Sequence, residues 1–327
     1  MHLGHTQHPR KRRGHLSLII PVLAGPTGAG KTDLVNSLDP ERFEIISLDS
    51  RQIYRYLTIG TAAPNPETLK YIKHHLVGII DPDQTFTAME YRQMALASIQ
   101  DVIDRNRIPM LVGGAGFYLQ MLITGPFDFE EDPEIRNRVK GMEHSERLEL
   151  LLQKDPECIV ATGESPSQGR IHPNDAYRVE RYLIMVLSTN KTMKELWEQK
   201  RNEPGSGFDF QGLFLYPGEE VLWQRLEIRA SEMIEQGILE EARSCRQRFG
   251  SCPGLKILGY PEALSCVDGD MSKEELKERL WIVHRQYARR QRIWFQKRSY
   301  VKFVDSLNSV DLEEAAINLF SGPGINH

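Results

Sequence analysis

Residues 18–32 read LIIPVLAGPTGAGKT, an apolar run that leads into a glycine-rich segment. The segment at 25–32, GPTGAGKT, fits the pattern G-x-x-x-x-G-K-[ST] of a phosphate-binding loop (P-loop) between a strand and a helix. Glycine tolerates backbone angles that let successive N–H groups point at an anion. Lys31 adds a positive charge, and the Thr32 hydroxyl suits a phosphate-bound Mg²⁺. Because the helix that begins at Lys31 also points its positive end at this anion, we predict a phosphate site here.

Strand and helix patterns alternate after this loop. FEIISLDS (43–50) reads as a strand that delivers Asp49 to the ligand edge of a sheet. Residues 51–67 contain prolines and are expected to lack regular structure. Further patterns are a short strand at 74–82, an amphipathic helix at 87–106, and a strand, glycine turn and helix at 107–123. This order predicts an α/β fold with a P-loop-type, mostly parallel sheet flanked by helices.

The character of the sequence changes near Phe127. From 127 to 203 the chain is charged and helix-like, which predicts a helical insertion domain that covers the site. Strand character returns at 208–217, three helical patterns follow at 219–237, 237–249 and 273–298, and YVKFVD (300–305) reads as a last strand. We therefore predict a catalytic core formed by 17–126 and 204–322. Residues 1–16 form a basic tail that we expect to be disordered.

Composition limits the class of protein. At 327 residues and 40% hydrophobic, the chain can bury a large core. No run reaches the roughly 18 to 20 apolar residues of a membrane span, and the basic stretch at 1–15 lacks the apolar middle of a secretory signal. The four cysteines lack C-x-x-C spacing, which favours reduced thiols in the cytoplasm over a zinc site. Since the net charge is −4, any RNA site must be a local basic patch.

Asp49 is the most informative carboxylate. At the end of a strand beside a P-loop, an aspartate can hold Mg²⁺ through water, as in an NTPase, or accept a proton from an attacking group, as in a transferase. Its position alone does not separate these roles. The polar neighbours Ser50, Gln52 and Tyr54 complete D-S-x-Q-x-Y, which suits recognition of a base edge or a ribose.

A second signal is basic. Residues 281–302, WIVHRQYARRQRIWFQKRSYVK, contain seven arginines and lysines and no acidic residue. Helical spacing places Arg285, Arg289 and Arg292 on one face. Val283, Tyr287 and Trp294 lie on a roughly neighbouring apolar face. Contacts with RNA phosphates and bases are one interpretation, and a solvated face of a packed helix is the other. A smaller basic group lies at 177–181.

Arg225 and Arg229 lie on one helical face in WQRLEIR. They could reach back to the P-loop anion and stabilise a departing diphosphate. Surface salt bridges with Glu227 or Glu232 are the alternative.

The combination resembles the tRNA dimethylallyltransferases, also called tRNA isopentenyltransferases or the IPP transferase family. Matching segments occur in the family's order from about residue 18 to residue 305. D-S-x-Q-x-Y, R-I-H-P-N-D and R-Q-x-A-x-R-Q are together specific, whereas the P-loop alone is shared by many enzymes. The segments are GPTGAGKT (25–32), SLDSRQIY (47–54), IGTAAP (59–64), IIDPDQTFTAMEYR (79–92), RIPMLVGGAGFYL (107–119), GRIHPNDAYRVER (169–181), ILGYPEA (257–263) and RQYARRQRIWF (285–295).

The resemblance implies transfer of a dimethylallyl group from dimethylallyl diphosphate to N6 of an adenosine next to the anticodon of tRNA, with release of diphosphate. It implies a cytoplasmic monomer without a membrane segment, whose partners are the tRNA anticodon stem-loop and the allylic diphosphate. Asp49 and Lys31 would be catalytic, and Thr32 would bind Mg²⁺. The diphosphate would be bound by Gly25, Pro26, Thr27, Gly28, Ala29, Gly30, Lys31, Thr32 and Arg225. The tRNA would be bound by Asp49, Ser50, Arg51, Gln52, Ala115, Arg136, Tyr177, Arg178, Arg181, Lys256, Gly259, Tyr260, Arg289, Arg290, Gln291 and Trp294.

Four positions depart from the family pattern. Ala115 replaces the usual threonine of G-G-T-G-L-Y, which removes a hydroxyl expected near the base and the diphosphate. Ala63 replaces a common lysine, His284 a threonine, and Pro261 an arginine or similar residue. Because Lys31, Thr32 and Asp49 are intact, these changes concern rate and tRNA affinity more than reaction class.

Two other functions are open at this point. A prenyltransferase that acts on free adenine nucleotides would not need the basic stretch 281–302 or the basic group at 177–181. An ATP-binding small-molecule kinase or NTPase would use the same P-loop, but would leave both basic groups unexplained.

Overall fold

The computed structural model describes residues 18–127, 129–160, 170–202 and 206–308. The chain divides into two compact units, one formed by the segments before residue 124 and after residue 205, and the other by 124–205. The tail expected at 1–16 lies outside the described residues. Among those residues, no helix combines the length and the apolar character that crossing a membrane requires.

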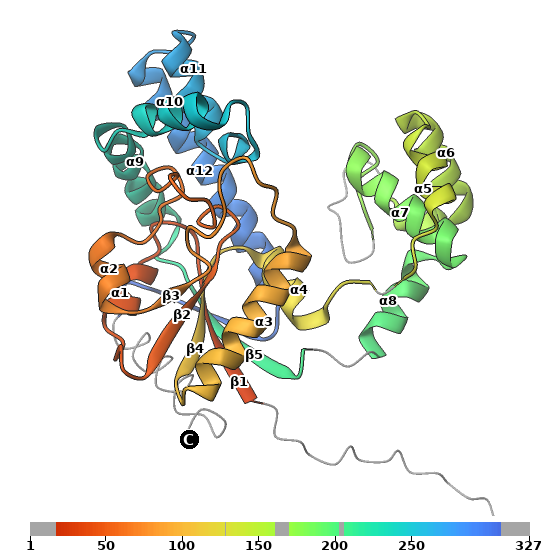
Figure 1. Ribbon diagram of the computed structural model, residues 1–327, viewed down its shortest axis with the longest axis horizontal. Helices are drawn as coiled ribbons and strands as arrows, with labels where there is room; N and C mark the ends of the chain where they lie inside the picture. The colour runs from red at the N-terminus through yellow and green to blue at the C-terminus, as the bar shows by residue number, and fades with distance from the viewer. Residues whose placement is uncertain (1–17, 128, 161–169, 203–205, 309–327) are drawn as a thin grey trace, which may run out of the picture. The chain divides into compact units, whose positions relative to one another are not determined.

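The first unit contains a six-stranded parallel sheet in the order β3-β2-β4-β1-β5-β6 (Figure 1). This confirms the predicted α/β fold. The register pairs Leu48 and Ala24 with Gly113, so that β2, β1 and β4 end at the same level. Loops that follow these strands therefore meet at one edge of the sheet, where α/β proteins bind ligands. The strands are β1 (Leu18–Ala24), β2 (Phe43–Leu48), β3 (His74–His75), β4 (Ile108–Gly113), β5 (Phe208–Leu215) and β6 (Val301–Val304).

Both faces of the sheet are buried, as parallel sheets require. On one face, Val22 and its neighbours pack against α3 (Ala88–Asp104) and α4 (Gly116–Thr124). On the other face, Leu23 packs in a cluster with residues of α1 (Lys31–Asn36). The alternation along each strand therefore fills two separate cores.

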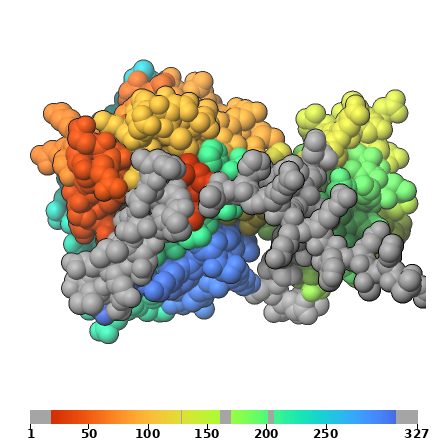
Figure 2. All heavy atoms as spheres, turned by 90° about the horizontal axis from the view of Figure 1, so that it is seen from below, coloured from red at the N-terminus to blue at the C-terminus, as the bar shows by residue number. Residues whose placement is uncertain are grey.

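Four further helices gather beyond one end of the sheet (Figure 1). They enclose their own apolar core, in which Tyr260 is fully buried. Seen from below, the surface of this unit combines N-terminal segments, red to gold, with the C-terminal segment in blue (Figure 2). The helices are α9 (Glu219–Glu235), α10 (Ile238–Phe249), α11 (Tyr260–Asp268) and α12 (Lys273–Gln296), with a short 3-10 helix, η2, at Pro253–Lys256.

The second unit is helical in its described residues, apart from one isolated bridge between Ile159 and Ile171. Helix α7 packs against α5 and α6, and Val179 and Leu183 of α7 are fully buried among apolar side chains of its neighbours. The elements are α5 (Pro133–Lys140), α6 (His144–Lys154), η1 (Pro156–Cys158), α7 (Ala176–Thr189) and α8 (Met193–Asn202).

Two local predictions were wrong, and one helix was not predicted. The strand expected at 74–82 is only two residues long, because Leu76 and Gly78 adopt positive φ angles that end it. The loop expected at 51–67 runs into a helix, α2 (Pro66–Tyr71), because proline fits the first helical position and the Asn65 side chain accepts a hydrogen bond from the Thr68 N–H. Helix α11 lies where no helix was expected.

Candidate functional site

The P-loop follows β1 directly. Gly25, Gly28 and Gly30 all have positive φ angles, as the sequence pattern requires. A side chain at Gly25 would come within 2.9 Å of the Leu215 carbonyl oxygen, so the loop can pass between its neighbours only with glycine at this position. The Gly25 N–H donates to the Gly113 carbonyl, which connects the loop to the end of β4.

Lys31 reaches the middle of this loop. Its Nζ donates to the carbonyl oxygens of Gly25 at 2.7 Å and Pro26 at 2.8 Å. Burial lowers the pKa of Lys31 to about 8, and the negative charge of Asp49 opposes part of that effect. Lys31 is therefore charged at neutral pH and electrostatically coupled to Asp49.

Asp49 follows β2 and is buried. Its Oδ1 accepts hydrogen bonds from the Arg51 backbone N–H at 2.8 Å and from Arg51 Nε at 3.4 Å. The contact of Oδ2 with Arg51 Nη2 is longer, at 3.5 Å. Arg51 thus orients the carboxylate without saturating it, which leaves Asp49 able to accept a hydrogen bond or a proton.

One cavity of about 570 Å³ connects the P-loop with Asp49. It lies at the carboxyl ends of β1, β2 and β4, where the strand order predicts a ligand site. Its volume is within the usual range of ligand pockets. The wall is formed by the P-loop, the end of β2, the segment 58–65 and one face of α9. Lining residues include Thr27, Gly28, Gly30, Lys31, Thr32, Asp33, Asp49, Gln52, Thr58, Ile59, Ala62, Ala63, Pro64, Asn65, Arg225, Ile228, Arg229, Glu232 and Gln236.

Arg225 and Arg229 extend from α9 toward the P-loop side of this cavity. Arg225 Nη1 donates to the Gly28 carbonyl at 2.9 Å. Burial lowers the pKa of Arg229, and its buried Nε has no hydrogen-bond partner among the described residues. Among the described residues, neither arginine forms an ion pair with Glu227 or Glu232, although Glu232 lines the same cavity and its charge raises the pKa of Arg229 against the effect of burial.

Two residues expected to touch tRNA are packed behind the glycine turn that follows β4. The buried Gln291 side chain donates from Nε2 to the Gly114 carbonyl at 3.0 Å. The indole of Trp294 lies so close to Gly116 that a side chain there would approach within 2.3 Å of the ring. Both residues therefore pack against the turn that carries Ala115; Gln291 is buried there, whereas Trp294 is half-buried.

Tyr260 also departs from the expectation of an RNA contact, because its side chain is fully buried. The buried Arg51 lies over the Tyr287 ring, with 4.5 Å between the guanidinium carbon and the ring centroid. Sequence reasoning placed Tyr287 on an apolar face and missed that it supports Arg51, because the packing partner lies far away in the chain.

Other predicted RNA contacts do lie on the surface. Arg289, Arg290 and Lys256 are exposed, and the Tyr177 side chain is 78% exposed on the helical unit. In the same unit, Arg136 and Arg181 both pair with Glu131, and Arg178 pairs with Asp175. Ser50 is half-buried and Gly259 is buried.

The basic face proposed for α12 is divided. Arg285 lies over Trp223 and Trp281, and Arg292 donates to the Tyr216 hydroxyl and pairs with Glu219. For these two arginines, the alternative of a packed helix face is the better description. Arg289 and Arg290 are exposed, and the guanidinium carbon of Arg290 lies 5.8 Å from the centroid of the Tyr287 ring.

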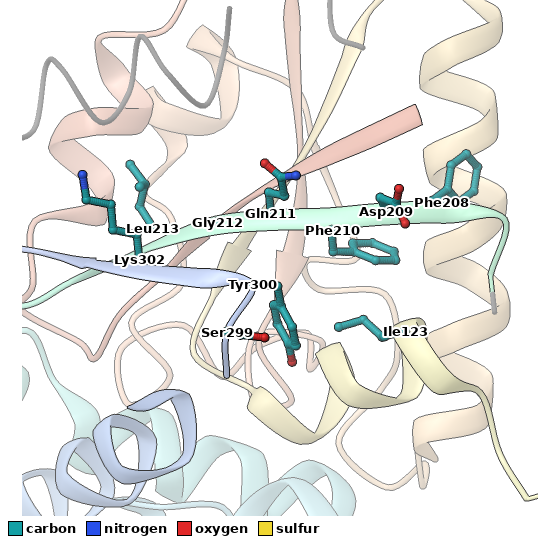
Figure 3. Close-up of a pocket in the computed structure, with 10 residues that line it drawn as sticks. All are labelled: Ile123, Phe208, Asp209, Phe210, Gln211, Gly212, Leu213, Ser299, Tyr300 and Lys302. Atoms are coloured by element: carbon teal, nitrogen blue, oxygen red, sulfur yellow. The ribbon is translucent and has the colours of Figure 1, made fainter. Parts of the chain in front are cut away.

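A second cavity lies along β5 and has a different character (Figure 3). Figure 3 shows Phe210, Tyr300 and Ile123 on one side of β5, while Asp209 and Gln211 point to the other side. Its lining contains no P-loop residue and a single basic side chain, Lys302, so it does not fit a diphosphate.

A metal site built by the protein alone is absent: the described residues contain no group of three histidine, cysteine, aspartate or glutamate side chains that could hold an ion. The Thr32 hydroxyl does line the cavity at the start of α1. This donor fits Mg²⁺, which commonly takes one or two protein ligands and completes its shell with substrate phosphates and water.

The chain is similar to known transferases over most of its length. The IPP transferase family model matches residues 52–298. The tRNA dimethylallyltransferase of Leptospira interrogans serogroup Icterohaemorrhagiae serovar Lai is 38% identical over 301 residues, which cover 89% of this chain and 97% of that protein. The protein of the same name from Koribacter versatilis is 37% identical, covering 86% and 91%.

Solved structures agree with these relatives. A crystallographically studied eukaryotic dimethylallyltransferase acting on tRNA matches with a TM-score of 0.79 and 26% identity, covering 93% of this chain and 80% of that one. The tRNA isopentenylpyrophosphate transferase of Bacillus halodurans matches with a TM-score of 0.65 and 27% identity, covering 94% and 97%.

Proposed function

The chain belongs to the IPP transferase family, and from this membership we propose that it transfers a dimethylallyl group from dimethylallyl diphosphate to N6 of an adenosine next to the anticodon of tRNA. The observation that carries the proposal is that Lys31 of the P-loop and Asp49 line the same cavity. An anion site and a proton acceptor are thus adjacent, as a transfer from a diphosphate to an amino group requires.

The diphosphate would lie on residues 25–32. Backbone N–H groups of the loop and the start of α1 favour negative charge, and Lys31 and Arg225 add cationic hydrogen-bond donors. Mg²⁺, held by Thr32 and the phosphate oxygens, would neutralise part of the charge on the leaving group. The same donors would stabilise the charge that develops as diphosphate departs.

The adenine would lie at the opposite wall, beside Asp49. Its N6 attacks the first carbon of the allyl group, the bond from that carbon to the diphosphate oxygen breaks, and its electron pair leaves with the diphosphate. The N6 proton passes to Asp49, a contribution worth roughly 10² to 10⁴ in rate. The base must first leave its stack, at a cost of a few kcal/mol that contacts with the protein would offset.

Contacts with the rest of the tRNA would come from exposed residues of both units. Arg289, Arg290 and Lys256 supply positive charge on the first unit, and Tyr177 supplies an exposed aromatic ring on the helical unit. We further propose that the enzyme acts as a monomer in the cytoplasm. Its four cysteines are free thiols, which suits a reducing compartment.

One assay separates this proposal from the alternatives. Purified protein is incubated with labelled dimethylallyl diphosphate and either unmodified tRNA or AMP, and ATP turnover is measured in parallel. Label in tRNA supports the proposal. Label in AMP alone would instead indicate a prenyltransferase of free nucleotides, and ATP turnover without label transfer would indicate a kinase or NTPase.

A further inference from the structure

Glu241 lies outside every sequence motif considered above, yet its carboxylate makes an unusual set of contacts. It accepts hydrogen bonds from the backbone N–H of Thr58 at 2.8 Å, Ile59 at 3.1 Å and Gly60 at 3.4 Å. The Thr58 hydroxyl donates to it at 3.0 Å, and the Tyr260 hydroxyl at 2.5 Å. Within the described residues, no basic side chain pairs with Glu241. Its negative charge is therefore stabilised by donors of one loop and one buried tyrosine.

Tyr260 contacts both Glu241 and the loop that Glu241 binds. Besides donating to Glu241, its hydroxyl oxygen accepts the Gly60 N–H at 3.2 Å. A side chain at Gly60 would come within 2.6 Å of the Tyr260 ring, so the loop and the ring fit together only with glycine at this position. Burial and the neighbouring carboxylate raise the pKa of Tyr260, which keeps its hydroxyl protonated as a donor.

The loop held in this way forms part of the cavity wall. Thr58, Ile59 and Ala62 all line the cavity that contains Lys31 and Asp49. On its cavity side, the loop is held by Gln52, whose Nε2 donates to the Ala62 carbonyl at 2.9 Å. The loop is therefore held by Gln52 on the side that faces the cavity and by Glu241 on the side that faces away from it.

The loop needs such support because its backbone is strained. Tyr56 and Ala62, on either side of residues 57–61, adopt φ angles of 65° and 58°. A positive φ angle at a residue other than glycine costs of order 1 kcal/mol. Such a backbone conformation persists only where surrounding contacts enforce it. Loss of the Glu241 contacts would allow the loop to relax and the wall to move.

We infer that Glu241 is a positioning residue that holds residues 58–62 against the hydrocarbon end of the allylic substrate. This rests on the proposed function. The wall contributed by the loop is largely apolar at Ile59 and Ala62, with Ile228 of α9 also lining the cavity. The diphosphate end of the same substrate would instead contact the P-loop, which Glu241 does not touch.

The inference predicts a selective defect in Glu241→Gln. Dissociation constants for dimethylallyl diphosphate and for inorganic diphosphate are measured by calorimetry. The charged hydrogen bonds lost from the loop correspond to a roughly tenfold or larger weakening of dimethylallyl diphosphate binding, while inorganic diphosphate stays within about twofold. Tyr260→Phe, which removes only one hydrogen-bond donor to Glu241, should weaken binding of dimethylallyl diphosphate by a smaller factor. Glu240→Gln, on the exposed side of the same helix, should change neither constant.

Equal weakening of both ligands in Glu241→Gln, or no weakening of either, would overturn the inference. Transfer of label to tRNA by the wild-type protein is measured in parallel. If the wild type transfers none, the proposed function fails, and the two dissociation constants alone decide the role of Glu241. Thermal unfolding of each variant separates a displaced loop from a misfolded protein.

Discussion

Two buried carboxylates lie near opposite ends of strand β2, and their surroundings differ. Glu44, near its start, is fully buried and pairs with Arg105, His75, Lys73 and Arg107. Burial alone would raise the pKa of Glu44, but hydrogen bonds from Arg105 and His75 outweigh it and hold the pKa at about 2. This carboxylate has several positively charged or hydrogen-bonding partners.

Asp49, directly after the same strand, forms an ion pair with one residue of the described part of the chain, Arg51. Arg51 contacts both carboxylate oxygens, but its side-chain contacts are long, at 3.4 and 3.5 Å, and the remaining side of the carboxylate lines a cavity. Because both carboxylates are buried but only Asp49 lines the cavity, burial alone does not identify a functional acid. A saturated carboxylate supports the fold, whereas an unsaturated one beside a cavity can take part in chemistry.

The largest effect is expected for Asp49→Asn. Asparagine retains an acceptor for the Arg51 N–H but cannot take up the N6 proton, so transfer to bound tRNA should slow by about 10² to 10⁴. Single-turnover transfer of labelled dimethylallyl diphosphate measures this rate, and filter binding measures tRNA affinity, which should stay within about threefold. Normal turnover of bound tRNA would refute the assignment of Asp49 as the base.

The opposite outcome is expected for Glu44→Gln. Loss of one charge from a buried pair should lower the free energy of unfolding by about 3 kcal/mol. This is the low end of the range for buried ion pairs, because Lys73 and Arg105 are partly exposed to solvent. Urea denaturation measures this loss, while the transfer rate of folded protein should be unchanged. A selective loss of activity at wild-type stability would show that Glu44, like Asp49, takes part in the reaction.

The pH dependence of stability tests the same contribution of Glu44. The pKa of Glu44 is lower in the folded protein than in the unfolded chain, so its contribution to stability is present above the unfolded value of about 4.5 and is lost as the pH falls toward 2. The difference in unfolding free energy between wild type and Glu44→Gln should therefore shrink over that range. A difference that grows as the pH falls would contradict the pairing described here.

Much of this arrangement could be predicted from the sequence. The P-loop pattern and the alternation of strands and helices predict the sheet, and a parallel sheet brings Asp49 to the same edge as Lys31. These features are local: each depends on a short run of residues and on rules for how strands and helices connect. Lys31 and Asp49 accordingly line one cavity, as their places in the sequence predict.

Long-range packing could not be predicted in this way. Glu241 lies 181 positions after Gly60, and Gln291 lies 177 after Gly114, so no spacing in the sequence reports either contact. Helical spacing placed Arg289 and Arg292 on one face, but could not show that only Arg292 has a tyrosine and a glutamate beside it. Motif matching also assigned Tyr260 to RNA, whereas its buried hydroxyl contacts the protein itself.

The pKa of Lys31 should respond to the charge of Asp49 but not to that of Glu44. Because its pKa is lowered to about 8, inorganic diphosphate should bind more weakly above pH 8, approaching a tenfold loss per pH unit. The charge of Asp49 raises this pKa, so in Asp49→Asn the loss should begin at lower pH. In Glu44→Gln the profile should match the wild type. Calorimetric titrations from pH 6.5 to about 9.5 measure all three, and identical profiles would show that Asp49 does not act on Lys31.

The smallest effect concerns two arginines on α12 that repeat the contrast between Glu44 and Asp49. Arg292 contacts Tyr216 and Glu219 through its Nη1, while Arg289 is exposed and makes no hydrogen bond or ion pair within the described part of the chain. If Arg289 binds an RNA phosphate, Arg289→Gln should make the slope of log affinity against log salt less negative by about 0.7, whereas Arg292→Gln should leave the slope unchanged and lower stability. Binding of tRNA between about 50 and 200 mM salt measures both slopes, and the expected change for Arg289→Gln is an approximately threefold smaller loss of affinity over that range. Equal slopes in the two variants would mean that the number of partners in the folded protein does not distinguish arginines that bind RNA from those that hold the helix in place.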